Sequence, residues 1–139
     1  MMDRMSDEID RVAAYLLLAR VSELRARPYV SDKLYLVAGG LATRALFPKT
    51  AAHCRAALLR HNSQHAIGKI DTFEQALRNA EFQLILKRTE QQYPHEHVEH
   101  LLAKLGLSAS SERERFSSPR QFFATLLQLD PAQLDDCLE

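Results

Sequence analysis

The sequence has no tryptophan, and cysteine, glycine and proline are scarce. Among 139 residues, two are Cys, four are Gly and five are Pro. Two cysteines as far apart as Cys54 and Cys137 do not make the disulfide framework that supports small secreted domains. The longest mostly apolar stretch, residues 34–46, is too short to cross a bilayer. We therefore expect neither a disulfide-stabilised fold nor an association with membranes.

The chain also lacks an excess of charge of either sign. It has 18 Lys and Arg against 18 Asp and Glu, whereas dedicated nucleic-acid-binding proteins usually carry a basic excess. Nucleic acid is therefore not the partner that we expect. The charge is unevenly spread, because residues 1–70 hold 11 basic and 6 acidic residues, a net charge of +5, and residues 71–139 hold 7 and 12, a net charge of −5. Such asymmetry can steer an acidic partner or support contacts between copies.

The first residues do not resemble a secretory signal. The segment Met-Met-Asp-Arg-Met-Ser-Asp-Glu is acidic, whereas a signal peptide begins with basic residues. Together with the few cysteines, this predicts a cytoplasmic protein. A length of 139 residues is typical of one domain and is sufficient to bury a core without disulfides or metals.

Helical patterns run through the whole sequence. Good helix formers dominate the composition, and apolar residues recur at helical spacing with no segment that alternates like a strand. The second of the predicted helices is apolar nearly all round, which is typical of a central, buried helix. The Gly39-Gly40 pair in its middle predicts either the close approach of a neighbour or a kink. Helices are predicted over residues 7–27, 31–47, 50 to between 62 and 68, 71–93, and 95–105.

These patterns predict an all-α fold, an antiparallel bundle of four to five helices with a short C-terminal helical appendage. We expect residues 1–106 to form the bundle core. Residues 107–118 are rich in Ser, and we expect them to form a mobile linker. Residues 119–139 form two short helices, each with a cap residue followed by Pro, which pack on the bundle or on a partner. Their apolar side chains must be buried somewhere. The predicted partner-binding residues are Phe122, Phe123, Leu126 and Leu127.

Two histidines and a cysteine in the third predicted helix suggest a metal site. On a helix, Cys54, His61 and His65 fall within an arc roughly 60° wide. The i, i+4 spacing of His61 and His65 points two imidazoles at one ion, and the Cys54 thiolate is a further candidate ligand. This stripe is predicted to face the core, so the alternative is a polar cluster inside the bundle. We do not expect a cofactor.

The same region has an arginine five residues before a histidine. The six residues Arg60-His61-Asn62-Ser63-Gln64-His65 resemble the Arg-x4-His catalytic motif of the HEPN ribonucleases, which are compact helical bundles of about this size. The resemblance implies that His65 acts on the ribose 2′-hydroxyl and that Arg60 stabilises the charge of the phosphate. On an unbroken helix, Arg60 and His65 lie about 140° apart. They can converge only if the helix ends between them.

The function that we predict from the sequence is non-catalytic. The apolar C-terminal helices and the uneven charge favour a protein-interaction or regulatory module that binds a protein partner or forms a homodimer. The alternative is an enzyme that uses the histidines of the third helix. It would act either through a metal bound by Cys54, His61 and His65 or through the Arg60 and His65 pair.

Overall fold

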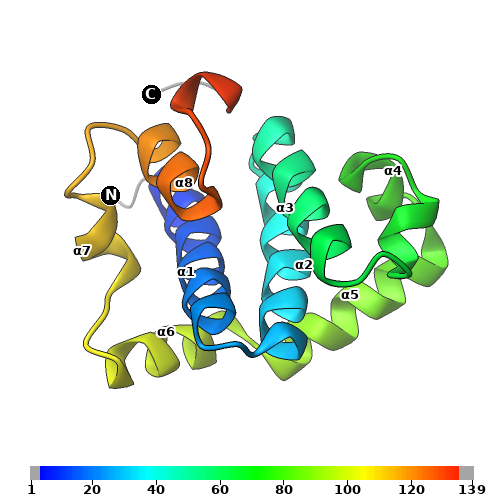
Figure 1. Ribbon diagram of the computed structural model, residues 1–139, viewed down its shortest axis with the longest axis horizontal. Helices are drawn as coiled ribbons and strands as arrows, with labels where there is room; N and C mark the ends of the chain where they lie inside the picture. Colours follow the sequence, from blue (N-terminus) through cyan, green and yellow to red (C-terminus); the bar gives the residue numbers. More distant parts are fainter. Residues whose placement is uncertain (1–3, 135–139) are drawn as a thin grey trace.

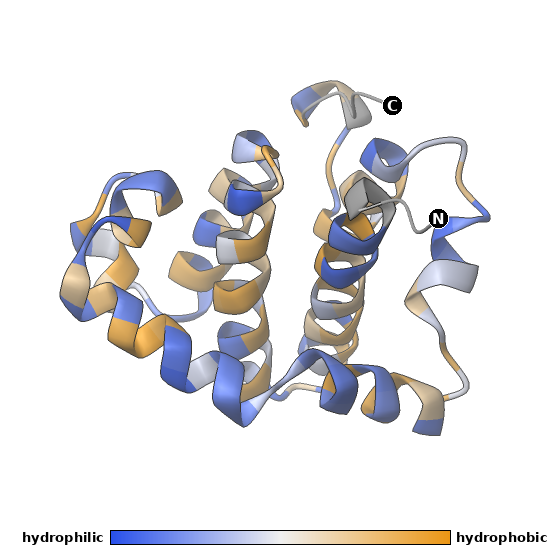
Figure 2. Cartoon of the chain, turned by 180° about the vertical axis from the view of Figure 1, so that it is seen from behind, coloured by the Kyte–Doolittle hydropathy of each residue, from blue (hydrophilic) through white to orange (hydrophobic). Residues whose placement is uncertain are grey.

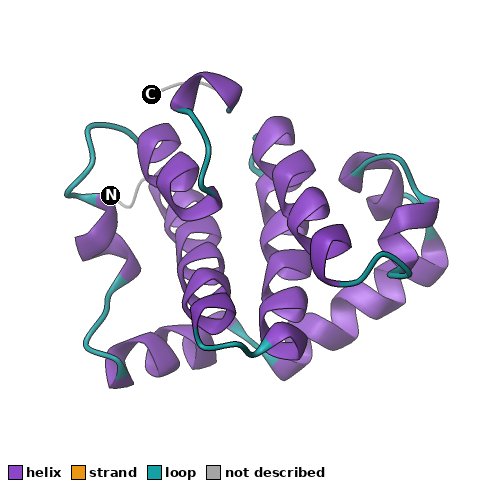
Figure 3. Ribbon diagram, in the orientation of Figure 1, coloured by secondary structure: helices purple, strands orange, loops and turns teal. Residues whose placement is uncertain are grey.

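The computed structural model describes residues 4–134, with the side chains of residues 7–130 and 132–134. The described chain is helical and contains no strand (Figure 3), which confirms the predicted all-α class. Two short 3-10 helices are also present, η1 between α3 and α4 and η2 after α8. The elements are α1 (Arg4–Leu24), α2 (Pro28–Arg44), α3 (Pro48–His61), η1 (Ala66–Lys69), α4 (Phe73–Leu77), α5 (Ala80–Gln92), α6 (His95–Lys104), α7 (Ala109–Arg113), α8 (Pro119–Leu127) and η2 (Pro131–Gln133).

Helices α1, α2 and α3 lie side by side and form the centre of the molecule (Figure 1). The two connections between them are short and have the same form. Each contains one residue with a left-handed backbone, Ala26 (φ 57°) or Leu46 (φ 68°), which ends the preceding helix. Each is followed by a proline at the first turn of the next helix, Pro28 or Pro48, whose fixed φ suits that position. The chain therefore reverses direction at each of the two connections, and each reversal takes only a few residues.

Helix α2 is the central helix, as its apolar sequence predicts. It packs on α1, α3, α4 and α5, and more than half of its residues are buried. The glycine pair lies where α4 and α5 approach. A Cβ atom on Gly39 would lie 2.3 Å from the ring of Phe73, and one on Gly40 would lie 3.1 Å from Leu86 Cδ2. The predicted close approach is confirmed, and α2 continues through the pair as one helix.

The predicted single helix over residues 71–93 is wrong, because the chain breaks it into α4 and α5. Arg78 and Asn79 lie between the two helices. Asn79 Oδ1 accepts a hydrogen bond from Phe82 N–H at 3.0 Å, which caps a new helix. The break turns α5, so that α5 packs on α2 beside Gly40 and α6 packs on α1, and both helices lie low in the view of Figure 1. The arrangement is therefore less regular than a simple bundle.

The C-terminal third packs back on the bundle. The segment predicted as a mobile linker contains α7, which begins at the cap residue Ser108. Helix α7 contacts α1, and Arg113 Nη2 lies 2.9 Å from Asp10 Oδ1. Helix α8 also packs on α1 and α3, and the phenyl rings of Phe47 and Phe123 meet edge to face at 5.9 Å. Residues 135–139, which include Cys137, lie outside the described part of the chain.

Hydrophobic residues concentrate on the inward sides of the central helices. Figure 2 shows them on α1 and α2, whereas α5 and α6 carry mostly hydrophilic residues on the outside. The core includes large side chains that are almost fully buried, among them Leu16, Tyr35, Phe73 and Phe122. None of the helices between residues 4 and 134 combines the length and apolarity needed to cross a membrane.

Candidate functional site

Polar side chains from three helices meet where α1 ends, α2 begins and α3 ends. The tight connection between α1 and α2 brings the last turn of α1 beside the first turns of α2, and α3 returns along α2 to the same end (Figure 1). We call these side chains the histidine–carboxylate cluster. It consists of Glu23, Asp32, Tyr35, His61 and His65.

His61 lies between the two carboxylates. Its Nε2 atom is 2.9 Å from Glu23 Oε2, and its Nδ1 atom is 3.0 Å from Asp32 Oδ1. The side chains are partly buried, with 26% of His61, 12% of Glu23 and 16% of Asp32 exposed. A neutral imidazole carries one N–H, so only a protonated ring can donate to both carboxylates. His61 thereby links α3 to both α1 and α2.

Glu23 is held from two further directions. The Tyr35 hydroxyl donates a hydrogen bond to Glu23 Oε1, and Arg20 Nη1 lies 3.5 Å from the same oxygen. Burial, together with the Glu23 carboxylate, raises the pKa of Tyr35 well above its usual range, so the hydroxyl remains a donor. Both oxygens of Glu23 therefore have partners, and the carboxylate is fixed in place.

Helix α3 ends at His61, although neither Gly nor Pro follows it. The Asn62 side chain provides the reason, since Asn62 Oδ1 accepts from Gln64 N–H at 3.2 Å. Its backbone carbonyl accepts from His65 N–H at 3.0 Å. Such Asx turns compete with helical hydrogen bonds. Beyond the turn, Ile67 is fully buried and anchors the segment to the core.

His65 is the cap residue before η1, and its pKa is affected by Asp32. Its Nδ1 atom accepts a hydrogen bond from Ile67 N–H at 3.1 Å. Burial lowers the pKa of His65, against the opposing effect of Asp32, so the ring is neutral near pH 7. A neutral ring that accepts at Nδ1 carries its proton on Nε2. The imidazole therefore offers Nε2–H as its remaining donor.

The residues predicted as metal ligands are not brought together as a ligand set. Cys54 is fully buried, and burial raises the pKa of its thiol to about 12. It therefore stays protonated and behaves as a small apolar side chain. His61 uses both ring nitrogens for carboxylates. Within the described residues, no three His, Cys, Asp or Glu side chains are arranged to hold a metal ion.

The ribonuclease motif meets its geometric condition, because α3 ends between Arg60 and His65. Arg60 is exposed on the last turn of α3. The His61 and His65 side chains both lie near Asp32, one by direct contact and one by its effect on the histidine pKa. The interrupted helix thus leaves His61 in contact with Asp32 and takes His65 off the helix, where its Nδ1 atom accepts from Ile67 N–H.

The sequence did not predict the part that Glu23, Asp32 and Tyr35 take in the cluster. One signal was present, since Glu23 lies near the C-terminal end of α1, where the helix dipole disfavours a carboxylate. A negative charge in that place calls for a cation, and Arg20 supplies one, while His61 Nε2 lies against the other carboxylate oxygen. Asp32 and Tyr35 carry no such signal, because their role depends on the way α3 returns along α2.

The predicted partner-binding residues lie inside this chain's own core. Phe122 is 2% exposed, Phe123 1%, Leu126 8% and Leu127 7%. The ring of Phe123 packs against Phe47, and the ring of Phe122 packs against Phe116. A partner could reach these side chains only if α8 left the bundle.

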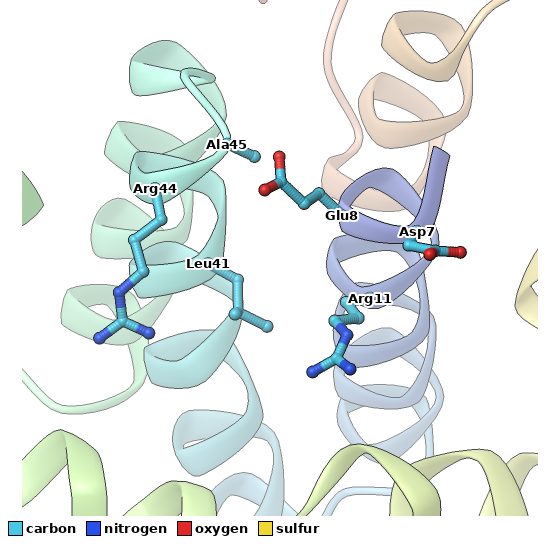
Figure 4. A pocket seen from close by; sticks show the side chains of 6 residues that line it. All are labelled: Asp7, Glu8, Arg11, Leu41, Arg44 and Ala45. Carbon is cyan, nitrogen blue, oxygen red and sulfur yellow. The ribbon is translucent and has the colours of Figure 1, made fainter. Parts of the chain in front are cut away.

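A hollow of about 390 Å³ lies between α1 and α2, at the opposite end of α2 from the cluster. Figure 4 shows Glu8 extending from α1 toward Ala45, while Asp7 points away. Arg11 and Arg44 add positive charge, and Leu41 is the apolar part of the lining. The lining contains no His, Cys, Ser or Tyr, so it offers neither an acid–base pair nor a nucleophile.

No protein-family model matches the chain, and no curated protein or solved structure matches it either. The chemistry of the cluster is therefore the basis for a functional hypothesis. Two imidazoles and two carboxylates, with Arg20 paired to one of the carboxylates, form a set that can take up and release protons. Such a set does not require a metal ion.

Proposed function

We propose that this chain cleaves RNA without a metal ion, at the histidine–carboxylate cluster, in the manner that the resemblance to HEPN ribonucleases implies. The observation that carries the proposal is the end of α3 at His61, between Arg60 and His65. On a continuous helix these two side chains would point apart by about 140°. The cluster also lies in the half of the chain with a net charge of +5, which favours approach of a polyanion.

The proposed reaction is transesterification. The ribose 2′-oxygen bonds to the adjacent phosphorus, the bond from phosphorus to the 5′-oxygen breaks, and a 2′,3′-cyclic phosphate and a 5′-hydroxyl form. The 2′-hydroxyl proton passes to a base, and the leaving oxygen takes a proton. Arg60 stabilises the negative charge that develops on the phosphate.

The hydrogen bond between His65 and Ile67 constrains the role of His65. In the neutral form described above, Nε2–H can donate to a phosphate oxygen. Taking the 2′-hydroxyl proton at Nε2 requires the ring to release Ile67 N–H and to carry its proton on Nδ1 instead. Asp32 is the neighbouring carboxylate that can stabilise that form, in the way that a carboxylate orients a catalytic histidine.

The test is cleavage of single-stranded RNA by the purified chain in the presence of EDTA. We expect products with 2′,3′-cyclic phosphate ends. His65→Asn should abolish cleavage, because it removes the imidazole, while leaving thermal stability nearly unchanged, since a short side-chain oxygen can still accept from Ile67 N–H. Arg60→Gln should lower the rate by about 100-fold or more.

A histidine outside the cluster serves as the control, and a variant of His61 tests the structural part of the cluster. His100→Asn, on the exposed side of α6, should change neither cleavage nor stability. His61→Ala should lower the free energy of unfolding by about 1–3 kcal/mol, because it leaves Glu23 and Asp32 without their shared partner. Cleavage that survives in His65→Asn, or that requires a divalent metal ion, would contradict the proposal.

A non-catalytic interaction module is the second candidate. The observation that favours it is the exposure of Leu24 (69%) and Tyr29 (85%) beside the first helix connection. In this second candidate function, the protein is cytoplasmic. It uses that surface to bind another protein or a second copy of itself. Sedimentation of the native chain and of Leu24→Glu would test it. A concentration-dependent dimer that the substitution dissociates, in a chain without RNA cleavage, favours this candidate.

A further inference from the structure

A groove with an apolar floor lies between α1 and α6. It has a volume of about 190 Å³ and shares no residue with the histidine–carboxylate cluster. Drug-sized ligands occupy pockets of about 300–1,000 Å³, so this groove suits a narrower guest. Val21 and Val30 are only partly covered by the rest of the chain. The floor consists of Leu18, Val21, Val30, Leu101 and Leu105.

The rim of the groove is positively charged. Arg25 and Arg27, in the connection between α1 and α2, and Lys104, the last residue of α6, line it, and the lining includes no carboxylate. All three side chains are exposed. None of them makes an ion pair or hydrogen bond with another residue of the described chain. The groove therefore favours a ligand with an anionic head and an apolar tail, because three cations without partners lie at the edge of an apolar floor.

We propose that this groove binds a carboxylate that carries a short apolar chain. The chain lies on the leucine and valine floor, where burial of each methylene is favourable. The carboxylate faces Arg25 and Arg27, whose guanidinium groups can each pair with two oxygens, while Lys104 adds a single charge. A saturated chain of about eight carbons offers this combination, and octanoate is the probe that we choose.

The experiment is an NMR titration of the full ¹⁵N-labelled chain with octanoate and, separately, with octan-1-ol. Octanoate should give saturable shifts of amides in residues 18–30 and 101–105. It should bind about tenfold more tightly than octan-1-ol, because charge-assisted hydrogen bonds stabilise its head group. Hexanoate should bind more weakly, by about fourfold for each methylene removed.

Variants separate the head group from the tail. A chain with Arg25→Gln, Arg27→Gln and Lys104→Gln should bind octanoate and octan-1-ol with equal affinity, while Arg88→Gln, on the exposed side of α5, should bind like the native chain. Shifts that centre elsewhere would overturn the proposal. It would also be overturned by the absence of saturable binding, or by octanoate binding no more tightly than octan-1-ol to the native chain. RNA cleavage plays no part in any of these outcomes.

Discussion

The two histidines of the cluster differ in the contacts that they make with the rest of the protein. His61 touches two carboxylates on two different helices, so its main effect is to tie the ends of three helices together. His65 makes one hydrogen bond to a backbone amide and keeps a second ring nitrogen for other partners. Sequence spacing alone treats the two as equivalent members of one stripe. Their separation follows from the turn at Asn62, which removes His65 from the helix.

The stability of the chain should fall below pH 6.5 because of His65 and His95. Burial lowers the pKa of both imidazoles, although Asp32 opposes this for His65 and Glu99 for His95. The unfolded-state pKa is about 6.5. Between the folded-state and unfolded-state values the unfolded chain binds more protons, so the free energy of unfolding rises with pH. Both groups are neutral above this window and contribute no slope there.

Thermal unfolding between pH 5 and pH 7.5 checks this expectation. The melting temperature of the native chain should drop on the acidic side, and the drop should be smaller in His65→Asn/His95→Asn. His97→Asn/His100→Asn is the matched control, since both of these side chains belong to residues on the exposed side of α6. An acid-induced drop that is equal in all three chains would assign the effect to other groups.

At the scale of the element, much of the helical pattern can be predicted from the sequence. The apolar sequence of α2 and the prolines near helix starts depend on local preferences, and the structure follows them. The break at Asn79 was missed, because Asn is tolerated within a helix and caps one only when its side chain finds the right amide. The cluster was half predicted for a similar reason. The histidines lie in one segment, but Glu23 and Asp32 join them only through tertiary packing.

The two glycines of α2 should respond differently to alanine. Gly39→Ala should destabilise the chain by about 1–3 kcal/mol, because the new methyl would collide with the Phe73 ring. Gly40→Ala is the matched control, since alanine gains up to about 1 kcal/mol of helix propensity and meets only the end of the Leu86 side chain. Urea unfolding of both variants measures the difference. Equal effects would mean that the Phe73 ring moves aside freely.

At the scale of the whole molecule, the C-terminal third completes the core that the first three helices begin. Helices α6, α7 and α8 all contact α1, and the α8 side chains fill the space beside Phe47. The apolar side chains of α8 were expected to be buried, and they are buried against the bundle of the same chain. Sequence cannot choose between a cover within the chain and a partner, because both bury the same apolar area.

Phe123→Ala tests this arrangement. Loss of a ring that is 1% exposed should reduce the free energy of unfolding by about 3–5 kcal/mol. Leu84→Ala, at a side chain that is 58% exposed, should change it by less than about 0.5 kcal/mol. Equilibrium unfolding and sedimentation would be measured on both. A Phe123→Ala chain of native stability but altered oligomeric state would instead favour α8 as a partner-binding helix.

The compact first half of the molecule has a consequence for the order in which the protein is made. Glu23, Asp32 and His61 all lie within the first 61 residues, in helices joined by short loops, and such local contacts form quickly. The partners of α1 in the last third of the chain leave the ribosome much later. We therefore expect the nascent chain to assemble the ends of α1, α2 and α3 while synthesis is still under way, and α8 to close over the exposed side of α1 as a late step.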